Sequence, residues 1–407
     1  MRYRLVLILI SLLVFGLVLG AVNSNAGSDP KFTLLVSQSI VDNGTIRLDA
    51  YRDDMLFSEP TVKHIQNGTI IEHDGHLYNY FPTGPSIFTL PIVAALRQSG
   101  MDMRLIEDSF LIQKILAAFT CVLMLWIVYK ISRCFLDEAS SVVISAVSVL
   151  GTTIISSMGT ALWTINFSTI FIALSLLLLA RYETKKSDTA HPIFLGILFF
   201  LAFFSRPSAA AFIVAALAYL LVKERRQFLV AASVSFLLLI LFTAWSRLEY
   251  GLWQPPYYSI ARLQAERVSI WTGLIGNLIS PSRGIFVFSP FFLLIIPGVL
   301  YVGRKLIRQP LMWMAVSWFV LSLILNARAV VWWGGDSFGP RLMTENVLAL
   351  VLLVIIIWKA AGSRLERRTK WIAAVLFSVL GLAAIFINSY QGLYNPDTLG
   401  WNLFVEH

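Results

Sequence analysis

Residues 228–246 read FLVAASVSFLLLILFTAWS and contain no charged side chain. A helix of about 20 apolar residues crosses the hydrocarbon layer of a bilayer, so this stretch predicts a transmembrane helix. Basic residues stand just before it, at Lys223, Arg225 and Arg226. Because Lys and Arg gather at the cytoplasmic ends of spans, the stretch also predicts the direction in which the chain crosses.

The whole chain of 407 residues has a similar composition. It is 57% hydrophobic and 14% charged, whereas soluble domains are roughly 45–50% apolar and about 25% charged. We therefore expect an all-α polytopic membrane protein with about eleven transmembrane helices, organised as a single domain over residues 1–407. The expected spans are 4–22, 108–129, 140–158, 162–180, 192–205, 208–222, 228–246, 285–302, 310–327, 343–360 and 371–388.

Two of these regions leave alternatives open. The first span follows Arg2 and Arg4 like a secretory signal, but its apolar run is longer than a signal core, so we expect a retained anchor. The stretches 192–205 and 208–222 are short and flank Ser205-Arg206-Pro207. They form either a hairpin of two short helices or one long helix kinked at Pro207.

The distribution of charged residues between the two sides of the membrane favours the hairpin over the kinked helix. With the N-terminus inside and all eleven spans crossing, the inner loops hold 18 of the 32 basic residues and 6 of the 23 acids, which is +12 inside and −3 outside. This division follows the positive-inside rule and needs no nucleic-acid partner. A fused 192–222 helix would place the basic clusters 304–308 and 363–370 outside, so we favour the hairpin. The outer segments are then 23–107, 247–284, 328–342 and a tail, 389–407.

Acidic residues in the first outer segment are candidates for catalysis. Asp29 follows the first span, and Asp53 and Asp54 lie some twenty residues further on. A carboxylate at the membrane surface can act as a general base or bind a metal ion. The alternative is that these acids cap helices or face water.

Aromatic residues follow in the segment HLYNYFPTGP, residues 76–85. Its alternation predicts a short extended segment, and its prolines and glycine a rigid turn. The apolar stretch 86–97 is too short to span and predicts an interfacial helix on the outer surface. Tyr78 and Tyr80 either anchor the chain at the interface or form a wall for a sugar or lipid headgroup.

Two arginines near span ends are candidates for binding an anion. Arg206 stands between two apolar helices, and an arginine at membrane depth is paired or functional. Arg283 opens a span within SPSRG, where it either snorkels to the interface or binds substrate.

The stretch VWWGGDSFGPR, residues 331–341, is the densest signal in the chain. Its glycines allow the backbone to approach a ligand closely, and Asp336 and Arg341 point into the loop from its two ends. Trp332 and Trp333 alone would fit an aromatic belt at the membrane interface. Because such a belt does not account for Gly-Gly-Asp or Gly-Pro-Arg, we expect the loop to bind substrate.

Motifs for other chemistries are missing from the sequence. It contains no glycine-rich nucleotide loop, no HExxH and no CxxC, and its five histidines are scattered. Cys121 and Cys134 lie in or beside one apolar stretch, which offers no disulfide framework.

The quoted segments together resemble those of the integral-membrane glycosyltransferases of the GT-C class, which includes protein O-mannosyltransferases and aminoarabinose transferases. Many relatives carry two adjacent acids after the first span, whereas Asp29 stands alone between Ser28 and Pro30, which leaves open whether it acts with Asp53 or Asp54. The segments that carry the resemblance are GSDPKFTLLVSQSIVDNGTIRLDAY, HLYNYFPTGPSIFTLP, FFSRPS, SPSRGIFVFSP and WWGGDSFGPR.

The resemblance implies a sugar donor carried on a polyprenyl phosphate, a lipid, glycan or protein acceptor, and transfer on the extracytoplasmic face of the cell membrane. It implies Asp29 as the general base and, if a divalent cation such as Mg²⁺ or Mn²⁺ takes part, as its ligand. The implied substrate contacts are Arg341 with Arg206 or Arg283 to the phosphate, and Tyr78, Tyr80, Trp332 and Asp336 to the sugar.

Two other functions share this topology. A transporter or flippase of lipid-linked sugars would place ionisable residues and broken helices at mid-membrane, whereas here Arg206 and Lys114 alone come near a span interior. A ligase or polymerase of surface polysaccharide uses the same substrates and stays open.

Overall fold

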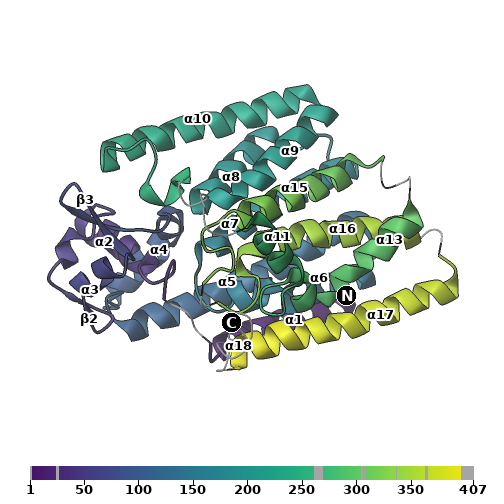
Figure 1. Cartoon of the computed structure of the whole chain (residues 1–407), viewed down its shortest axis with the longest axis horizontal. Coiled ribbons are helices and arrows are strands. Elements are labelled where there is room, and N and C mark those ends of the chain that lie inside the picture. The colour runs from purple at the N-terminus through teal and green to yellow at the C-terminus, as the bar shows by residue number, and fades with distance from the viewer. Residues whose placement is uncertain are drawn as a thin grey trace.

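The computed structural model describes residues 2–23, 27–260, 269–303, 306, 308–335, 337–362 and 365–395. Asp336 and the end of the predicted outer tail therefore lie outside the described residues. Figure 1 shows a bundle of helices with a smaller lobe, residues 27–105, at one end. Among the described residues, strands form only two small antiparallel pairs, and both belong to this outer lobe.

The described residues contain six helices that are long and apolar enough to cross a bilayer, accompanied by shorter apolar helices. The long helices are α5 (Ile106–Phe135), α7 (Thr164–Glu183), α10 (Arg225–Tyr250), α15 (Pro310–Ala327), α16 (Thr344–Gly362) and α17 (Arg367–Ile385). The shorter helices of the bundle are α1 (Arg2–Leu19), α6 (Glu138–Leu150), α8 (Pro192–Ser205), α9 (Ala210–Lys223), α11 (Ile270–Ile279), α12 (Ile285–Phe288), α13 (Ile295–Val302) and α18 (Gly392–Tyr394).

Every predicted span coincides with one or more of these helices, which confirms an all-α polytopic membrane protein. Two predicted spans are interrupted. The span 140–158 breaks after α6 and resumes as a π-helical turn, Ile154–Met158. The span 285–302 breaks at Pro290, which has no amide hydrogen to continue the helix, and passes through a 3-10 turn, Pro290–Leu294, into α13.

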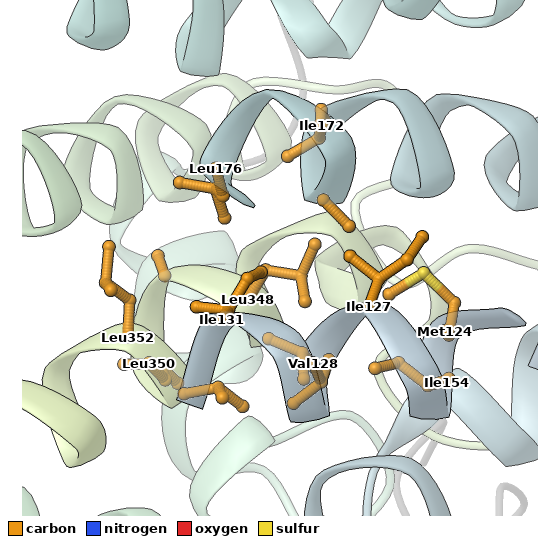
Figure 2. Close-up of a cluster of buried hydrophobic side chains, with 14 of the residues drawn as sticks. Met124, Ile127, Val128, Ile131, Ile154, Ile172, Leu176, Leu348, Leu350 and Leu352 are labelled. Atoms are coloured by element: carbon orange, nitrogen blue, oxygen red, sulfur yellow. The ribbon is translucent and has the colours of Figure 1, made fainter. Parts of the chain in front are cut away.

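The long helices differ in how much of their apolar surface is buried inside the protein. In the span Arg341–Gly362, which contains α16, 78% of the most apolar window is buried, against 11% in α10 and 22% in Arg367–Tyr394. A helix that is apolar all round and buried lies in a core, whereas α10 and α17 present exposed apolar side chains of the kind that lipid covers. Figure 2 shows the core, in which residues of α5, α7 and α16 meet: Met124, Ile127, Val128, Ile131, Ile172, Leu176, Leu348, Leu350 and Leu352.

Helices α8 and α9 form the predicted hairpin. The backbone of Arg206 is extended (φ −161°, ψ 125°), so α8 ends at Ser205. The rings of Phe199 and Phe212 pack edge to face with centroids 5.8 Å apart, although a continuous helix would separate these residues by about 20 Å along its axis. The chain therefore turns back at Arg206, close to the outer lobe, because a Cβ atom at Gly84 would lie 2.6 Å from the backbone oxygen of Phe204.

The outer lobe has its own hydrophobic core, which includes Leu35, Leu77 and Val93 and continues through Ile112 of α5. Asp74 and Gly75 both adopt positive φ and make the two-residue turn between β3 and β4. The segment expected as an interfacial helix over 86–97 is α4, which packs against α2. The lobe's elements are α2 (Thr33–Asn43), β1 (Met55–Leu56), β2 (Glu59–Pro60), α3 (Thr61–Gln66), β3 (Ile70–His73), β4 (His76–Asn79) and α4 (Gly84–Gln98).

Candidate active site

A cavity of about 750 Å³ lies where the outer segments of the chain meet. Its wall includes Asp29 after α1, Arg206 between α8 and α9, and Arg341 before α16. Ligand-binding cavities commonly measure about 300–1,000 Å³, so the volume suits a substrate of sugar-phosphate size. Three predicted site residues, far apart in sequence, thus share one wall.

Asp29 is the acidic group of this wall. Its side chain is 8% exposed, and its Oδ2 accepts a hydrogen bond of 2.7 Å from the hydroxyl of Thr164, the first residue of α7. The N-terminus of a helix favours negative charge, because its amide groups point outward. Its other oxygen has Ser28 Oγ at 3.5 Å, the limit of a hydrogen bond. The side chain is therefore held from α7 and lines the cavity.

Arg206 is a cationic group of the same wall. It lies at the turn between α8 and α9. It is 8% exposed and lines the cavity. Its backbone amide donates to Ala202 at 2.9 Å, but its guanidinium forms no hydrogen bond or ion pair with the described residues. A buried cation without a partner is unfavourable, so the site suits an anion that would complete it.

Arg341 lies at the start of α16 and is fixed from two sides. Its Nη2 donates to the carbonyl of Gly334 at 2.7 Å. Its guanidinium stacks on the ring of Trp163, 4.2 Å from the centroid. Trp163 directly precedes Thr164, so α7 begins with one residue that holds the cavity's acid and another that supports one of its cations.

The aromatic side of the cavity includes two tyrosines that the sequence analysis did not select. Tyr257 and Tyr258 line it together with Phe81 and Phe203. The hydroxyl of Tyr258 donates to the carbonyl of Phe204 at 2.7 Å, and burial raises the pKa of Tyr258 well above its ordinary value. The signal in the sequence was the run Pro-Pro-Tyr-Tyr within an outer loop.

Glu345 is a buried carboxylate beside the cavity that sequence analysis also missed. It is 4% exposed, in the first turn of α16. Its Oε1 accepts from the hydroxyl of Ser168 on α7, and its Oε2 accepts from the hydroxyl of Ser208, at 2.7 Å. Ser208 itself lines the cavity. An acid inside a predicted span, 343–360, was the signal that could have identified it.

Residues 91–246 match the family model described as dolichyl-phosphate-mannose-protein mannosyltransferase. The matched region runs from α4 to α10 and contains Thr164 and Arg206. This match supports a GT-C glycosyltransferase-like membrane protein. No curated protein matches it.

Arg283, outside the matched region, binds the backbone of the loop before α16. Its Nη1 donates to the carbonyls of Ser337 and Gly339, the latter at 3.2 Å, and its Nη2 donates to Gly335 at 2.7 Å. It does not belong to the cavity wall described above. Arg283 therefore stabilises the conformation of this loop through its backbone carbonyls. A contact from Arg283 to the substrate phosphate stays a prediction.

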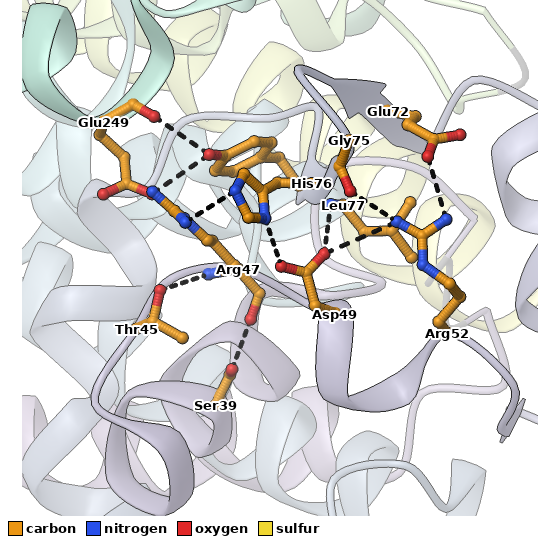
Figure 3. A network of polar contacts seen from close by, with 11 residues as sticks. Ser39, Thr45, Arg47, Asp49, Arg52, Glu72, Gly75, His76, Leu77 and Glu249 are labelled. Atoms are coloured by element: carbon orange, nitrogen blue, oxygen red, sulfur yellow. Dashed lines mark hydrogen bonds and ion pairs between the residues drawn. The ribbon is translucent and has the colours of Figure 1, made fainter.

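Tyr78 joins the outer lobe to the end of α10. Its hydroxyl donates to the backbone carbonyl of Glu249 at 3.1 Å and to its carboxylate at 3.2 Å. Burial and the Glu249 charge raise the pKa of Tyr78 to about 12. Figure 3 shows the surrounding network, in which Arg47 pairs with Glu249 at 2.7 Å and His76 with Asp49 at 2.7 Å. The network lies away from the cavity wall.

The other predicted aromatic residues do not belong to the cavity's lining. Tyr80 packs edge-on against Tyr257, with centroids 5.5 Å apart, and so supports the aromatic side. Trp332 packs over Gly276 of α11, where a Cβ atom would meet its ring at 2.3 Å. Trp333 packs against Trp332 with centroids 5.9 Å apart. Asp336 lies outside the described residues.

The remaining predicted acids are separate from Asp29. Asp53 is exposed, and Asp54 pairs with Arg104 at 2.9 Å within the outer lobe. Neither lines the cavity. Of the three candidates, which the sequence left open, Asp29 alone lines the cavity.

Proposed function

We propose that the protein transfers a sugar from a polyprenyl-phosphate-linked donor to a hydroxyl of a lipid, glycan or protein acceptor on the extracytoplasmic face of the plasma membrane. The observation that carries this proposal is the shared wall of Asp29 and Arg206 in a cavity of about 750 Å³. Asp29 supplies a carboxylate that can take the acceptor's proton, and Arg206 supplies a guanidinium, without a partner among the described residues, that can bind a phosphate.

The reaction exchanges one bond at the anomeric carbon for another. The acceptor oxygen attacks this carbon while its proton passes to the carboxylate of Asp29. The bond from the anomeric carbon to the phosphate oxygen breaks, and its electron pair leaves with the lipid phosphate. Arg206 donates to the phosphate oxygens, since a guanidinium matches them in pairs, and Arg341 adds positive charge to the same wall.

A divalent cation, Mg²⁺ or Mn²⁺, could bind to the carboxylate of Asp29 together with the phosphate of the bound donor. Mg²⁺ is usually held by one or two carboxylates together with substrate phosphates, and Asp29 supplies one carboxylate. The described residues contain no group of three or more metal-binding side chains that would hold an ion without substrate. We therefore expect chelation to weaken donor binding without unfolding the protein.

The proposed orientation places the N-terminus in the cytoplasm and the cavity and C-terminus outside. The outer lobe lies at one end of the bundle, and the basic starts of α10 and α17 lie at the other (Figure 1). A membrane-impermeant maleimide should label Ser99→Cys in intact cells and Asp188→Cys only after lysis. Both native cysteines are buried, so the parent chain serves as the unlabelled control.

The test of transfer uses purified protein in lipid vesicles with a radiolabelled polyprenyl-phosphate hexose or pentose and a membrane extract as acceptor. We expect transfer by the parent chain and loss of at least about a hundredfold in kcat for Asp29→Asn. Asp188→Asn, which changes an exposed acid of an inner loop, is the matched control and should keep full activity.

Arg206→Gln should chiefly weaken donor binding, with Arg226→Gln, an exposed inner arginine, as its control. Equal transfer by the parent and Asp29→Asn would remove the catalytic assignment. Translocation of the lipid-linked sugar without transfer would favour a flippase, and extension of a polysaccharide chain would identify a ligase or polymerase.

A further inference from the structure

The buried carboxylate of Glu345 controls how one hydroxyl on the cavity wall can hydrogen-bond. A carboxylate accepts hydrogen bonds and donates none. Because Glu345 Oε2 accepts from Ser208 Oγ at 2.7 Å, the single proton of this hydroxyl is committed to Glu345. The oxygen of Ser208 therefore faces a ligand with its lone pairs, as an acceptor.

Ser208 and Arg206 then offer opposite hydrogen-bonding groups to the same ligand. They stand two residues apart around the 3-10 turn Pro207–Ala209, and both line the cavity. The guanidinium offers donors that suit phosphate oxygens, which only accept. The serine oxygen, with the Glu345 carboxylate behind it, repels an anion and suits a hydroxyl that donates.

The carboxylate that imposes this polarity is rigidly held. Its other oxygen accepts from Ser168, which follows Thr164 by one helical turn, so the two side chains lie on the same face of α7. Thr164 holds Asp29. One face of α7 thus fixes both the acid at the reacting centre and the acid behind Ser208.

We propose that Ser208 accepts a hydrogen bond from a hydroxyl of the transferred sugar and thereby determines which donor sugars are used, with Glu345 as the positioning residue that orients it. This inference rests on the proposed function, because it concerns the donor bound in the same cavity. It makes the sugar specificity a property of the α8–α9 turn and α16, not of the outer lobe.

The test compares a polyprenyl-phosphate hexose that the parent chain uses with its monodeoxy analogues, through the ratio of kcat/KM values. The parent should discriminate against one analogue by about tenfold, the value of one hydrogen bond. Ser208→Ala should lower kcat/KM for the full sugar by a similar factor and use that analogue as well as the full sugar. Ser208→Thr, which keeps the hydroxyl, should restore discrimination.

Glu345→Gln should also reduce discrimination, because an amide can donate to Ser208 and reverse the polarity of the bond. Ser99→Ala, at an exposed position of the outer lobe, is the control, and thermal unfolding checks that each variant is folded. Discrimination unchanged in Ser208→Ala, or no discrimination by the parent, would overturn the inference. Absence of transfer by the parent from any lipid-linked sugar would instead overturn the proposed function.

Discussion

Thr164 donates its hydroxyl to Asp29 across 2.7 Å, although 135 residues separate the two in sequence. The residue before it, Trp163, carries the guanidinium of Arg341 on its ring. The start of α7 therefore connects the first outer segment with the last outer loop of the described chain. The following predictions begin from this relationship.

Replacing Thr164 by Val should impair transfer while leaving the fold intact. Valine keeps the shape of threonine but removes the donor to Asp29, and a hydrogen bond to a charged group contributes roughly 1.5–3 kcal/mol. We expect kcat/KM for sugar transfer to fall by about ten- to a hundredfold. Thr164→Ser keeps the hydroxyl and should retain most activity; equal loss in both variants would show that this bond does not position Asp29.

Replacing Arg283 by Lys should loosen the loop before α16. Lysine keeps the charge but cannot donate to three carbonyls in the geometry of a guanidinium, so the carbonyls of Gly335 and Gly339 lose a partner. We expect a loss of about 1–3 kcal/mol in the free energy of unfolding and faster proteolysis within 328–342. Arg308→Lys, an exposed inner position, is the control. A higher KM for donor with unchanged stability and proteolysis would instead indicate a contact to substrate.

The outer lobe should lose stability when acid protonates Asp102. Burial raises the pKa of this carboxyl, but hydrogen bonds from the Arg104 side chain and backbone and from Gln38 outweigh it and lower the pKa to about 2. A lowered pKa stabilises the fold above the ordinary value of about 3.9, and this stabilisation disappears as the pH falls from about 4 toward 2.

The measurement for Asp102 is the melting temperature in detergent between pH 7 and pH 2. Asp102→Asn should melt at lower temperature at pH 7 and show a weaker decline below pH 4 than the parent. Parallel curves for the two proteins would show that other carboxyls govern the acid response.

Gly84→Ala should displace the outer lobe from the membrane helices. A Cβ atom at Gly84 would lie 2.6 Å from the backbone oxygen of Phe204, two residues before Arg206. Backbone cannot move aside as a flexible side chain can, so we expect a destabilisation of about 1–3 kcal/mol and reduced transfer. Gly16→Ala is the matched control, since its Cβ would meet nothing within 4 Å. Unaltered melting of Gly84→Ala would show that α4 can shift freely.

The long helices of the bundle were predictable because their apolar length matches the thickness of the bilayer. The interruption at Pro290 within 285–302 was visible as a residue type but not as a break, since prolines also occur in continuous spans. The small sheets and hydrophobic core of the outer lobe were not foreseen. Their strands are 2–4 residues long, which is too short for a periodic pattern to emerge.

The sequence predicted those site residues that are ionisable and lie at the outer end of a span. Asp29, Arg206 and Arg341 were each selected as ionisable residues at outer span ends, and they share the cavity wall. Arg283 met the same criterion, yet it contacts loop carbonyls, because residue type and position do not distinguish a structural donor from a ligand contact. Glu345 was not selected from the sequence. Its two serine partners, Ser168 and Ser208, are distant from it in sequence and meet it only in the folded chain.

The attachment of two cavity groups to adjacent residues has a mechanical consequence. A rigid shift of α7 carries Trp163 and Thr164 together, and with them Arg341 and Asp29, so the spacing of these two groups resists such a shift. Arg206 stands on a separate turn, and its guanidinium has no partner among the described residues. A displacement of α7 relative to the α8–α9 turn would therefore change the distance from Asp29 to Arg206 more than the distance from Asp29 to Arg341.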